Sequence, residues 1–186
     1  MEWTQDDIAK LQAFTQTIDS DDIKIKEQIK EKLLNNKYII HVLNNEELEK
    51  LDSEADEYYG INILPYYIVS PTQTNVQNFV CFEINYEELD RYNSAVKKLN
   101  IVFYILCHQK NIIDEDTGIS RHDLLAALIQ HDFNFTNYFG KKIKLKSDVS
   151  NVVDTNYACR VLTFEQITDN NLVKTYNNQP RLANKF

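Results

Sequence analysis

A dipeptide of histidine and aspartate occurs twice in the stretch SRHDLLAALIQHD, residues 120–132. Imidazole nitrogens and carboxylate oxygens hold catalytic metal ions in many hydrolases, so the stretch raises the hypothesis of a metal centre. The two pairs lie nine residues apart in a helical pattern, and nine steps of about 100° turn through roughly 900°. His122 and His131 therefore lie on opposite sides of one helix, and the two pairs cannot bind one ion together.

Ordinary helix rules give the first aspartate of the stretch a structural explanation. Ser120 precedes Asp123 by three residues, which is the spacing of a capping box at a helix N-terminus. An apolar stripe then follows at helical spacing: Leu124, Leu125, Leu128 and Ile129. The metal hypothesis that remains is a phosphohydrolase site in which His108, at the end of a predicted strand, approaches His122 and Asp123.

A second acidic stretch, DEDTG at residues 114–118, partly matches a calcium-binding loop. Asp114 and Asp116 occupy the first and third ligand positions. Gly118 comes one position too early, however, and Leu125 stands where the loop requires a glutamate. We therefore expect an acidic surface turn. Since no glycine-rich phosphate loop or GxSxG motif occurs either, the sequence predicts no catalytic residue, no metal site and no cofactor.

A row of lysines is the remaining candidate for binding. Lys142, Lys144 and Lys146 alternate with Ile143 and Leu145, so the three lysines share one face of a predicted strand. The whole chain has a formal net charge of -8, which opposes non-specific binding to nucleic acid or anionic membranes. Two interpretations stay open. The lysines protect an exposed strand edge, or they form a basic face that meets phosphates or an acidic partner surface.

Composition limits the fold class and the compartment. The chain has 186 residues, of which 43% are hydrophobic and 26% charged, enough for one globular domain with a substantial core. Its three cysteines lie in apolar runs without CxxC spacing, which predicts buried thiols in a reducing compartment. The N-terminus has no signal-peptide pattern, and prolines interrupt the uncharged stretch 60–82. We therefore expect assembly in a cytosol and no membrane span.

The hydrophobic patterns predict one α+β domain over residues 1–168. A helical segment covers about residues 1–50, although KYIIHVLNN within it fits either a helical turn or a short strand. NILPYYIVS and NFVCFEINY predict a hairpin whose first strand lies at an edge because of Pro65. NIVFYILCH is apolar on both faces, and KKIKLKS with YACRVLTFE predicts a second hairpin. The helix after Ser120 packs on this mainly antiparallel sheet of about four to five strands.

The order of these elements resembles that of a family of small phage proteins. The similarity rests on the helical KEKLLNNKYIIHVLNN, the strands LPYYIVS, NFVCFEI and NIVFYILCHQ, the helix ISRHDLLAALIQHDF and the closing strands KKIKLKSD and VVDTNYACRVLTFE. Together they are similar to tail-terminator and neck proteins of tailed bacteriophages, over roughly residues 33–165. The long helical N-terminus and the polar residues 169–186 depart from compact members, which leaves ring size and position in the neck open.

That resemblance implies a structural virion protein, assembled in the host cytoplasm, with no enzymatic activity. Members form rings, typically hexamers, that join the tail tube to the connector and let double-stranded DNA pass without its sequence being read. The implied partners are therefore other copies of the chain, the adjacent connector, neck and tail tube proteins, and DNA near Lys142, Lys144 and Lys146. Residues 169–186 would form a polar arm between subunits. Its candidate contact residues are Leu172, Tyr176, Arg181 and Phe186.

Two alternative functions stay open. A head-completion or adaptor protein shares the assembly role but sits on the head side of the connector. A metal-dependent phosphohydrolase would instead use His108, His122 and Asp123.

Overall fold

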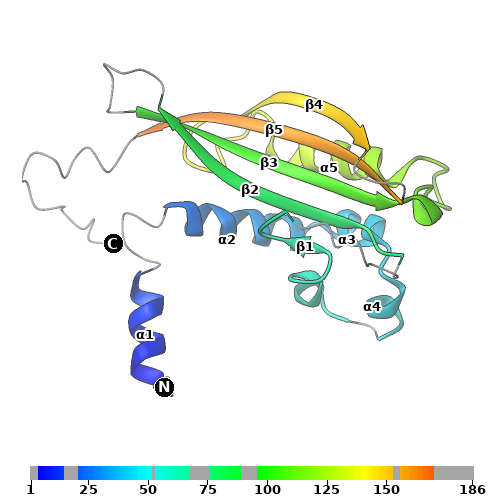
Figure 1. The fold of residues 1–186 in the computed structure, drawn as a ribbon, viewed down its shortest axis with the longest axis horizontal. Coiled ribbons are helices and arrows are strands. Elements are labelled where there is room, and N and C mark those ends of the chain that lie inside the picture. Colours follow the sequence, from blue (N-terminus) through cyan, green and yellow to red (C-terminus); the bar gives the residue numbers. More distant parts are fainter. Residues whose placement is uncertain are drawn as a thin grey trace, which may run out of the picture.

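The computed structural model describes residues 4–14, 21–51, 53–67, 76–88, 96–152 and 156–169. The helices are α1 (Gln5–Phe14), α2 (Asp21–Leu34), α3 (Lys37–Leu43), α4 (Glu46–Lys50) and α5 (Arg121–Phe133), with short 3-10 helices η2 (Ala55–Tyr58) and η3 (Gln109–Asn111). The strands are β1 (Ile63–Leu64), β2 (Phe79–Glu88), β3 (Val96–His108), β4 (Lys144–Val152) and β5 (Tyr157–Asp169). They form a five-stranded sheet in the order β1-β2-β3-β5-β4 (Figure 1).

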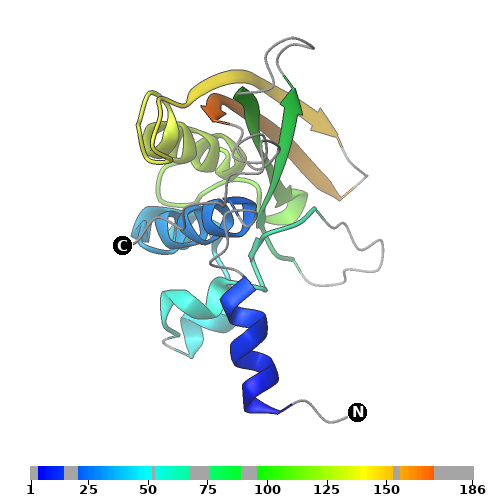
Figure 2. The same cartoon turned by 90° about the vertical axis from the view of Figure 1, so that its left-hand side faces the viewer.

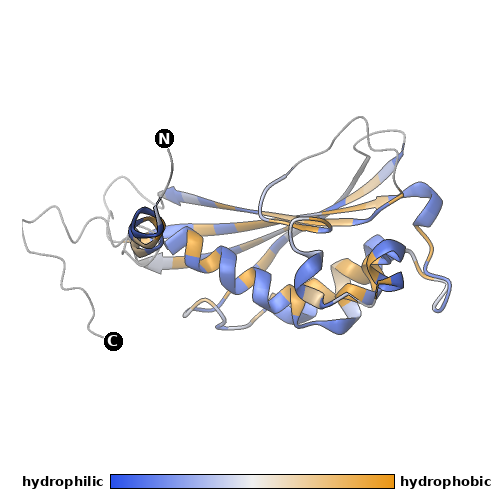
Figure 3. Cartoon of the chain, turned by 90° about the horizontal axis from the view of Figure 1, so that it is seen from below, coloured by the Kyte–Doolittle hydropathy of each residue, from blue (hydrophilic) through white to orange (hydrophobic). Residues whose placement is uncertain are grey.

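Helices α2, α3 and α5 lie on one face of the sheet, so the fold is α+β as predicted (Figures 1 and 2). Seen from below, the strands lie to one side and these helices to the other (Figure 3). Alternate residues of β3 point into this layer and are buried: Leu99, Ile101, Phe103, Ile105 and Cys107. They belong to one apolar cluster with Ile29 of α2 and with Leu125 and Phe133 of α5. Because full burial of each such side chain stabilises by about 1.5–3 kcal/mol, this layer is the core.

The opposite face of the sheet carries a smaller apolar cluster. Its members are Leu64, Phe79, Cys81, Leu106, Tyr157 and Cys159, all buried although no described helix covers them. Tyr67, which follows β1, packs against Tyr104 with the ring centroids 4.4 Å apart. β3 therefore contributes buried residues to both faces, as its sequence predicts. The three cysteines are buried free thiols, which also agrees with the prediction.

The first predicted hairpin is wrong. β1 pairs with β2 in the parallel direction, with Ile63 opposite Val80 and Leu64 opposite Cys81. A hairpin would require antiparallel pairing. β1 is only two residues long, so its direction depends on how α4 and η2 bring the chain to the sheet, which strand periodicity cannot reveal. The expected edge position is confirmed, since β1 is the outer strand and Pro65 follows it directly.

Other local predictions hold. β4 and β5 pair antiparallel, and KYIIHVL forms helix α3, which decides between the helix and strand alternatives. At the start of α1, the Thr4 amide donates to Asp7 Oδ2 at 3.0 Å and the Asp7 amide donates to Thr4 Oγ1 at 3.2 Å. This is a complete capping box. None of the described helices combines the length and apolar character needed to cross a membrane.

Candidate functional site

The aspartates of the two His-Asp pairs of α5 form hydrogen bonds with different neighbours. Asp123, at the start of the helix, accepts hydrogen bonds from Ser120 and Arg160. Asp132, near its end, accepts a hydrogen bond from Asn36 Nδ2 at 2.7 Å, at the junction of α2 and α3. His131 is exposed beside it. The helical phase thus separates the pairs, as the sequence predicts.

The predicted capping box at Ser120 forms only in part, because the hydrogen bond from the helix backbone to the Ser120 side chain is missing. Ser120 is the N-cap residue, but its side chain makes no hydrogen bond to a backbone N–H of the helix. Its hydroxyl donates to the Asp123 carboxylate instead. The reason is tertiary: Arg160 of β5 binds the other oxygen of Asp123, so this carboxylate is directed toward the sheet and not toward the helix terminus.

Arg160 joins three elements on the helix-covered face of the sheet. Its Nε and NH2 groups donate to the two oxygens of Asp148 in β4, at 2.7 and 2.8 Å, and NH1 donates to Asp123 of α5. Gln130 of α5 also donates to Asp148 Oδ2, at 2.8 Å. The hydrogen bonds from Arg160 lower the pKa of Asp148 against the opposing effect of burial. All these groups are matched with one another, which is typical of a structural ion cluster.

The structure does not bring together His108, His122 and Asp123, the trio of the phosphohydrolase hypothesis. The His108 ring packs edge-on against Tyr157, in the smaller apolar cluster on the open face of the sheet, and its Nδ1 accepts from the Lys110 amide at 3.1 Å. Asp123 lies on the helix-covered face with Arg160. Strand alternation points His108 to the open face, whereas His122 and Asp123 belong to α5 on the other face. Of the trio, the structure brings only His122 and Asp123 together, with His122 Nε2 at 3.5 Å from Asp123 Oδ1.

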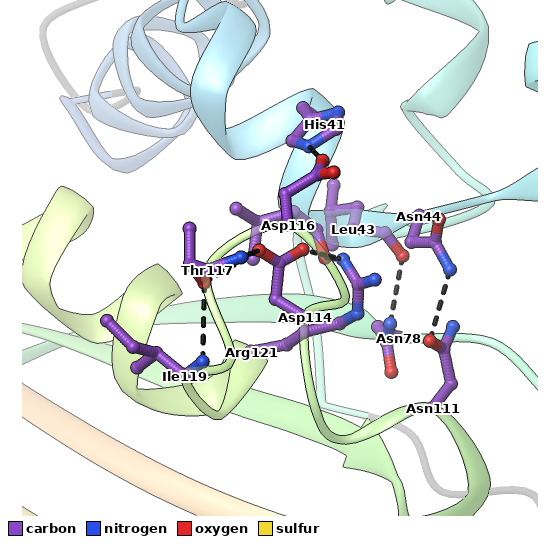
Figure 4. Close-up of polar contacts among 11 residues, drawn as sticks. His41, Leu43, Asn44, Asn78, Asn111, Asp114, Asp116, Thr117, Ile119 and Arg121 are labelled. Atoms are coloured by element: carbon purple, nitrogen blue, oxygen red, sulfur yellow. Dashed lines mark hydrogen bonds and ion pairs between the residues drawn. The ribbon is translucent and has the colours of Figure 1, made fainter.

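A different group has suitable ligand types at close range: His41 of α3 with Asp114 and Asp116 of the loop before α5 (Figure 4). One ligand atom from each lies within 4.8 Å of the others, the one such group among the described residues. His41 Nε2 is 3.2 Å from Asp116 Oδ2, and both side chains are exposed. Asp114 and Asp116 are the two aspartates whose spacing partly matches a calcium-binding loop in the sequence. His41 is missed because it is 73 positions before Asp114 in the sequence.

The buried member of this group is already fully bonded. Asp114 Oδ1 forms an ion pair with Arg121 NH1 at 2.9 Å, and Oδ2 accepts from the amide and hydroxyl of Thr117 at 3.0 and 2.7 Å. The hydrogen bonds from Thr117 are the main cause of a lowered pKa for Asp114. A divalent cation would have to displace these donors beside a buried guanidinium, so the residues fit a structural turn better than a metal site.

A chain of buried amides lies near this turn, and sequence reasoning missed it; Figure 4 shows one member, Asn78, with the Leu43 carbonyl. Asn78 Nδ2 donates to the Leu43 carbonyl at 3.0 Å, and its Oδ1 accepts from the His108 amide at 3.1 Å. Asn62 Nδ2 donates to the Asn78 carbonyl, and Asn62 Oδ1 accepts from Asn45 at 2.7 Å. These bonds tie the end of α3 to the sheet. An asparagine beside each element boundary was the only sequence signal for them.

The lysine row lies at the outer edge of the sheet, where β4 is the last strand. Lys142, Lys144 and Lys146 are exposed, while Ile143 is buried and Leu145 half-buried. Lys142 precedes the strand, and an irregularity between Leu145 and Ser147 leaves Lys146 outside the regular pairing with β5. We call Lys98, Lys142, Lys144 and Lys146 the basic edge.

The basic edge is only partly neutralised. Lys146 Nζ lies 3.8 Å from Glu165 Oε2, and Lys98 Nζ lies 2.6 Å from Glu87 Oε2. Neither Lys142 nor Lys144 forms an ion pair with an acidic residue in the described part of the chain. With Lys98 they line a groove of about 550 Å³ that also contains Ile167, which is 55% exposed. Lys142 Nζ lies 5.2 Å from the centroid of the Phe135 ring. This edge therefore combines cations that lack an acidic partner in the described chain with exposed apolar surface.

The far side of the molecule has the opposite charge. Six exposed acidic residues, which we call the acidic end, cluster in and around α4 and η2: Glu46, Glu47, Glu49, Glu54, Asp56 and Glu57. In both Figure 1 and Figure 2, α4 and β4 lie on opposite sides of the chain. Of the six, Glu46 is paired with Lys50 at 3.0 Å. The four candidate arm residues, Leu172, Tyr176, Arg181 and Phe186, lie outside the described residues.

Comparisons with known proteins give a family but no reaction. A comparison with curated proteins found no match. The model of the family described as YomW matches residues 19–166, which span α2 to β5 and include the basic edge and the acidic end. Because this match covers most of the chain, the protein belongs to the YomW family.

Proposed function

We propose that this protein is a structural subunit that associates head to tail with its own copies to form a ring. The observation that carries the proposal is the opposite charge of opposite sides of the molecule, with the basic edge at β4 and the acidic end at α4 and η2. A contact between two different surfaces of identical subunits generates a ring when its rotation closes.

The basic edge has the composition of an interface as well as its charge. Val149 and Ile167, both on the open face of the sheet near the lysines, are 54% and 55% exposed. Isolated surface ion pairs contribute only about 0–1 kcal/mol each, so the lysines set the orientation and partner choice more than the affinity. The apolar residues would supply the buried centre of the contact.

The place of this ring in a virion follows from the resemblance to tail-terminator and neck proteins. We propose that the ring, a hexamer as in such proteins, joins tail tube to connector and lets double-stranded DNA pass. The α+β fold, with its helices on one face of the sheet, agrees with that element order. A head-completion or adaptor protein of the connector would use the same surfaces, so it remains the second candidate.

Charge reversal with mixing tests the ring directly. One variant carries Lys142→Glu, Lys144→Glu and Lys146→Glu, and the other Glu46→Lys, Glu47→Lys and Glu49→Lys. Each should be monomeric by native mass spectrometry, because both of its contact surfaces then have the same sign. Mixing the two variants should restore association. The control, Asp6→Lys at an exposed position of α1 outside both surfaces, should assemble like the unmodified chain.

Three results would contradict the proposal. The unmodified chain could remain monomeric at every concentration, or the mixture of variants could fail to associate. Bound metal in a monomer with phosphatase activity would favour the enzyme instead. A separate experiment concerns the DNA. Lys142→Gln, Lys144→Gln and Lys146→Gln in the phage should impair particle assembly or genome retention, and unchanged particles would exclude a role for these lysines.

A further inference from the structure

A groove of about 580 Å³ opens between α2 and the end of the sheet at which β5 stops. Three apolar residues line it, Ile25 from α2, Leu99 from β3 and Phe139 from the loop before β4. Thr168, the second-last residue of β5, also lines it. The chain beyond Asp169 therefore begins at the groove itself.

Two polar atoms inside this groove have no partner among the described residues. Gln166 is 3% exposed, and its Nε2 donates to the Phe139 carbonyl at 3.1 Å, but its Oε1 accepts nothing. The Tyr86 hydroxyl is also buried and unpaired. Burial, with Asp21 and Asp22 nearby, raises the pKa of Tyr86 to about 12, so the group is a neutral hydroxyl at neutral pH. Each unmatched buried group costs about 1–3 kcal/mol, so native proteins usually provide a partner.

The rim of the groove selects the charge of what binds there. Asp21, Glu27 and Glu31 project from α2 along one side. Asp21 Oδ2 lies 3.8 Å from Lys97 Nζ, and Glu27 Oε1 lies 2.7 Å from Lys30 Nζ. Glu31 has no ion pair within the described chain. A ligand that presents amide groups to Gln166 and Tyr86 and cations to α2 would satisfy the site. An extended peptide rich in asparagine and lysine has both.

The residues that follow β5 have this composition. Residues 170–186 read NNLVKTYNNQPRLANKF, with Lys174, Arg181 and Lys185 and no acidic side chain. Asn170 and Asn171 come first, followed by two apolar residues and then Lys174. An extended chain advances about 3.3 Å per residue, so these residues can pass along the groove without any linker.

We infer that the C-terminal segment after Asp169 binds in the groove of its own chain, between α2 and the end of the sheet. Its amide groups bond to Gln166 Oε1 and the Tyr86 hydroxyl, its apolar residues contact Ile25 and Phe139, and its cations face the acidic rim. This differs from the inter-subunit arm that the phage resemblance implies, and it does not depend on ring formation.

Cross-linking in the full chain tests this placement. The variant Lys24→Cys with Thr175→Cys places one thiol on the groove and one on the segment, and a short bismaleimide should link them within one chain. The matched control is Ile167→Cys with Thr175→Cys. Ile167 is exposed on the open face of the sheet only two residues before Asp169, so it is near the start of the segment but outside the groove. The groove pair should react at least about tenfold faster because its effective concentration is higher.

The readout is the mass and size of the products. Cross-linked monomers that form faster in the Lys24 pair than in the Ile167 pair support the inference, and adding Lys174→Glu should slow their formation. Equal rates for both pairs would overturn it. Cross-linked dimers in place of monomers would also overturn it, since the segment would then occupy the groove of another copy. The buried native thiols do not compete, because burial raises the pKa of Cys107 and Cys159.

Discussion

The two ends of the helix-covered layer differ in whether their unmatched buried polar groups line a groove. At the end formed by α3 and the loop before α5, both oxygens of Asp114 and the side chains of Asn62 and Asn78 have partners. The Nε of Arg121 and the Nδ1 of the adjacent His122 are unmatched there, but neither residue lines the groove below α2. At the other end, below α2, Gln166 Oε1 and the Tyr86 hydroxyl face a groove without partners.

This difference distinguishes a polar cluster that stabilises the fold from a groove that can bind a ligand. A polar cluster whose members bond to one another has little capacity left for a ligand, even where its residue types are those of a metal site. His41, Asp114 and Asp116 are such a case. A groove with unmatched buried groups is the reverse, because a ligand there gains hydrogen bonds that the chain alone does not make. His41, Asp114 and Asp116 therefore fit a structural role, whereas the groove below α2 suits an asparagine-rich peptide.

The largest effect should come from breaking the buried ion pair. Asp114→Ala removes the charge that compensates Arg121, and breaking a buried pair in this way costs about 3–5 kcal/mol of unfolding free energy. Urea unfolding followed by circular dichroism measures it. Asp116→Ala is the matched control, since its side chain is exposed and its pairing with His41 is worth at most about 1 kcal/mol. Equal losses would show that Asp114 is no more structural than its neighbour.

The amide chain should give the next largest effect. Asn78→Ala leaves the Leu43 carbonyl and the His108 amide without partners in the interior, which should lower the unfolding free energy by about 1–3 kcal/mol. Asn137→Ala, in an exposed turn, serves as the control and should change stability by less than about 0.5 kcal/mol. If the two variants are equally stable, the end at α3 is less tightly bonded than the distances indicate.

Acid should act on the Arg160 cluster with a defined sign. Because Arg160 lowers the pKa of Asp148 in the folded state, the cluster stabilises fully above the ordinary aspartate pKa of about 4 and loses its contribution as the pH falls below that value. Arg160→Gln should cost about 1 kcal/mol at pH 7, where the cluster is half-exposed. The same variant should show a smaller further loss between pH 5 and pH 3 than the unmodified chain, measured by urea unfolding at each pH. Lys30→Gln, which removes an exposed ion pair, should not alter the acid dependence.

The groove should give the smallest effect, with a dependence on the C-terminal segment. In a full-length chain whose segment carries Lys174→Glu, Arg181→Glu and Lys185→Glu, Tyr86→Phe should not lower the unfolding free energy, because it removes a buried hydroxyl that then has no partner. In the unmodified chain the same substitution should cost about 0.5–1.5 kcal/mol, the value of one net hydrogen bond. If Tyr86→Phe costs the same in both chains, the groove does not bind the segment, and the two ends of the layer do not differ in the way that we propose.

The sequence predicts the periodic elements and misses what distant residues build together. The leucine stripe of α5, the two-sided β3 and the β4–β5 hairpin each follow from a local pattern, and the structure confirms them. The parallel pairing of β1 was missed because a strand of two residues has no sequence pattern that reveals the direction in which it pairs. The hydrogen bonds of Asn78 join residues that lie 30 and 35 positions apart, and the Ser120 cap was displaced by Arg160 from β5. The hydrogen bonds of such side chains depend on partners that are distant in the sequence.

The irregularity at Lys146 has a consequence for how copies of the chain can meet. A regular outer strand offers a row of backbone donors and acceptors on which another strand can be added, and growth of that kind leads to fibrils. The irregular pairing beside Lys146 interrupts this row near the start of β4, where charged side chains flank it, and the regular part of the strand begins at Ser147. In the ring that we propose, copies that meet at the lysines would therefore contact one another through side chains, and such contacts can select one partner and still separate.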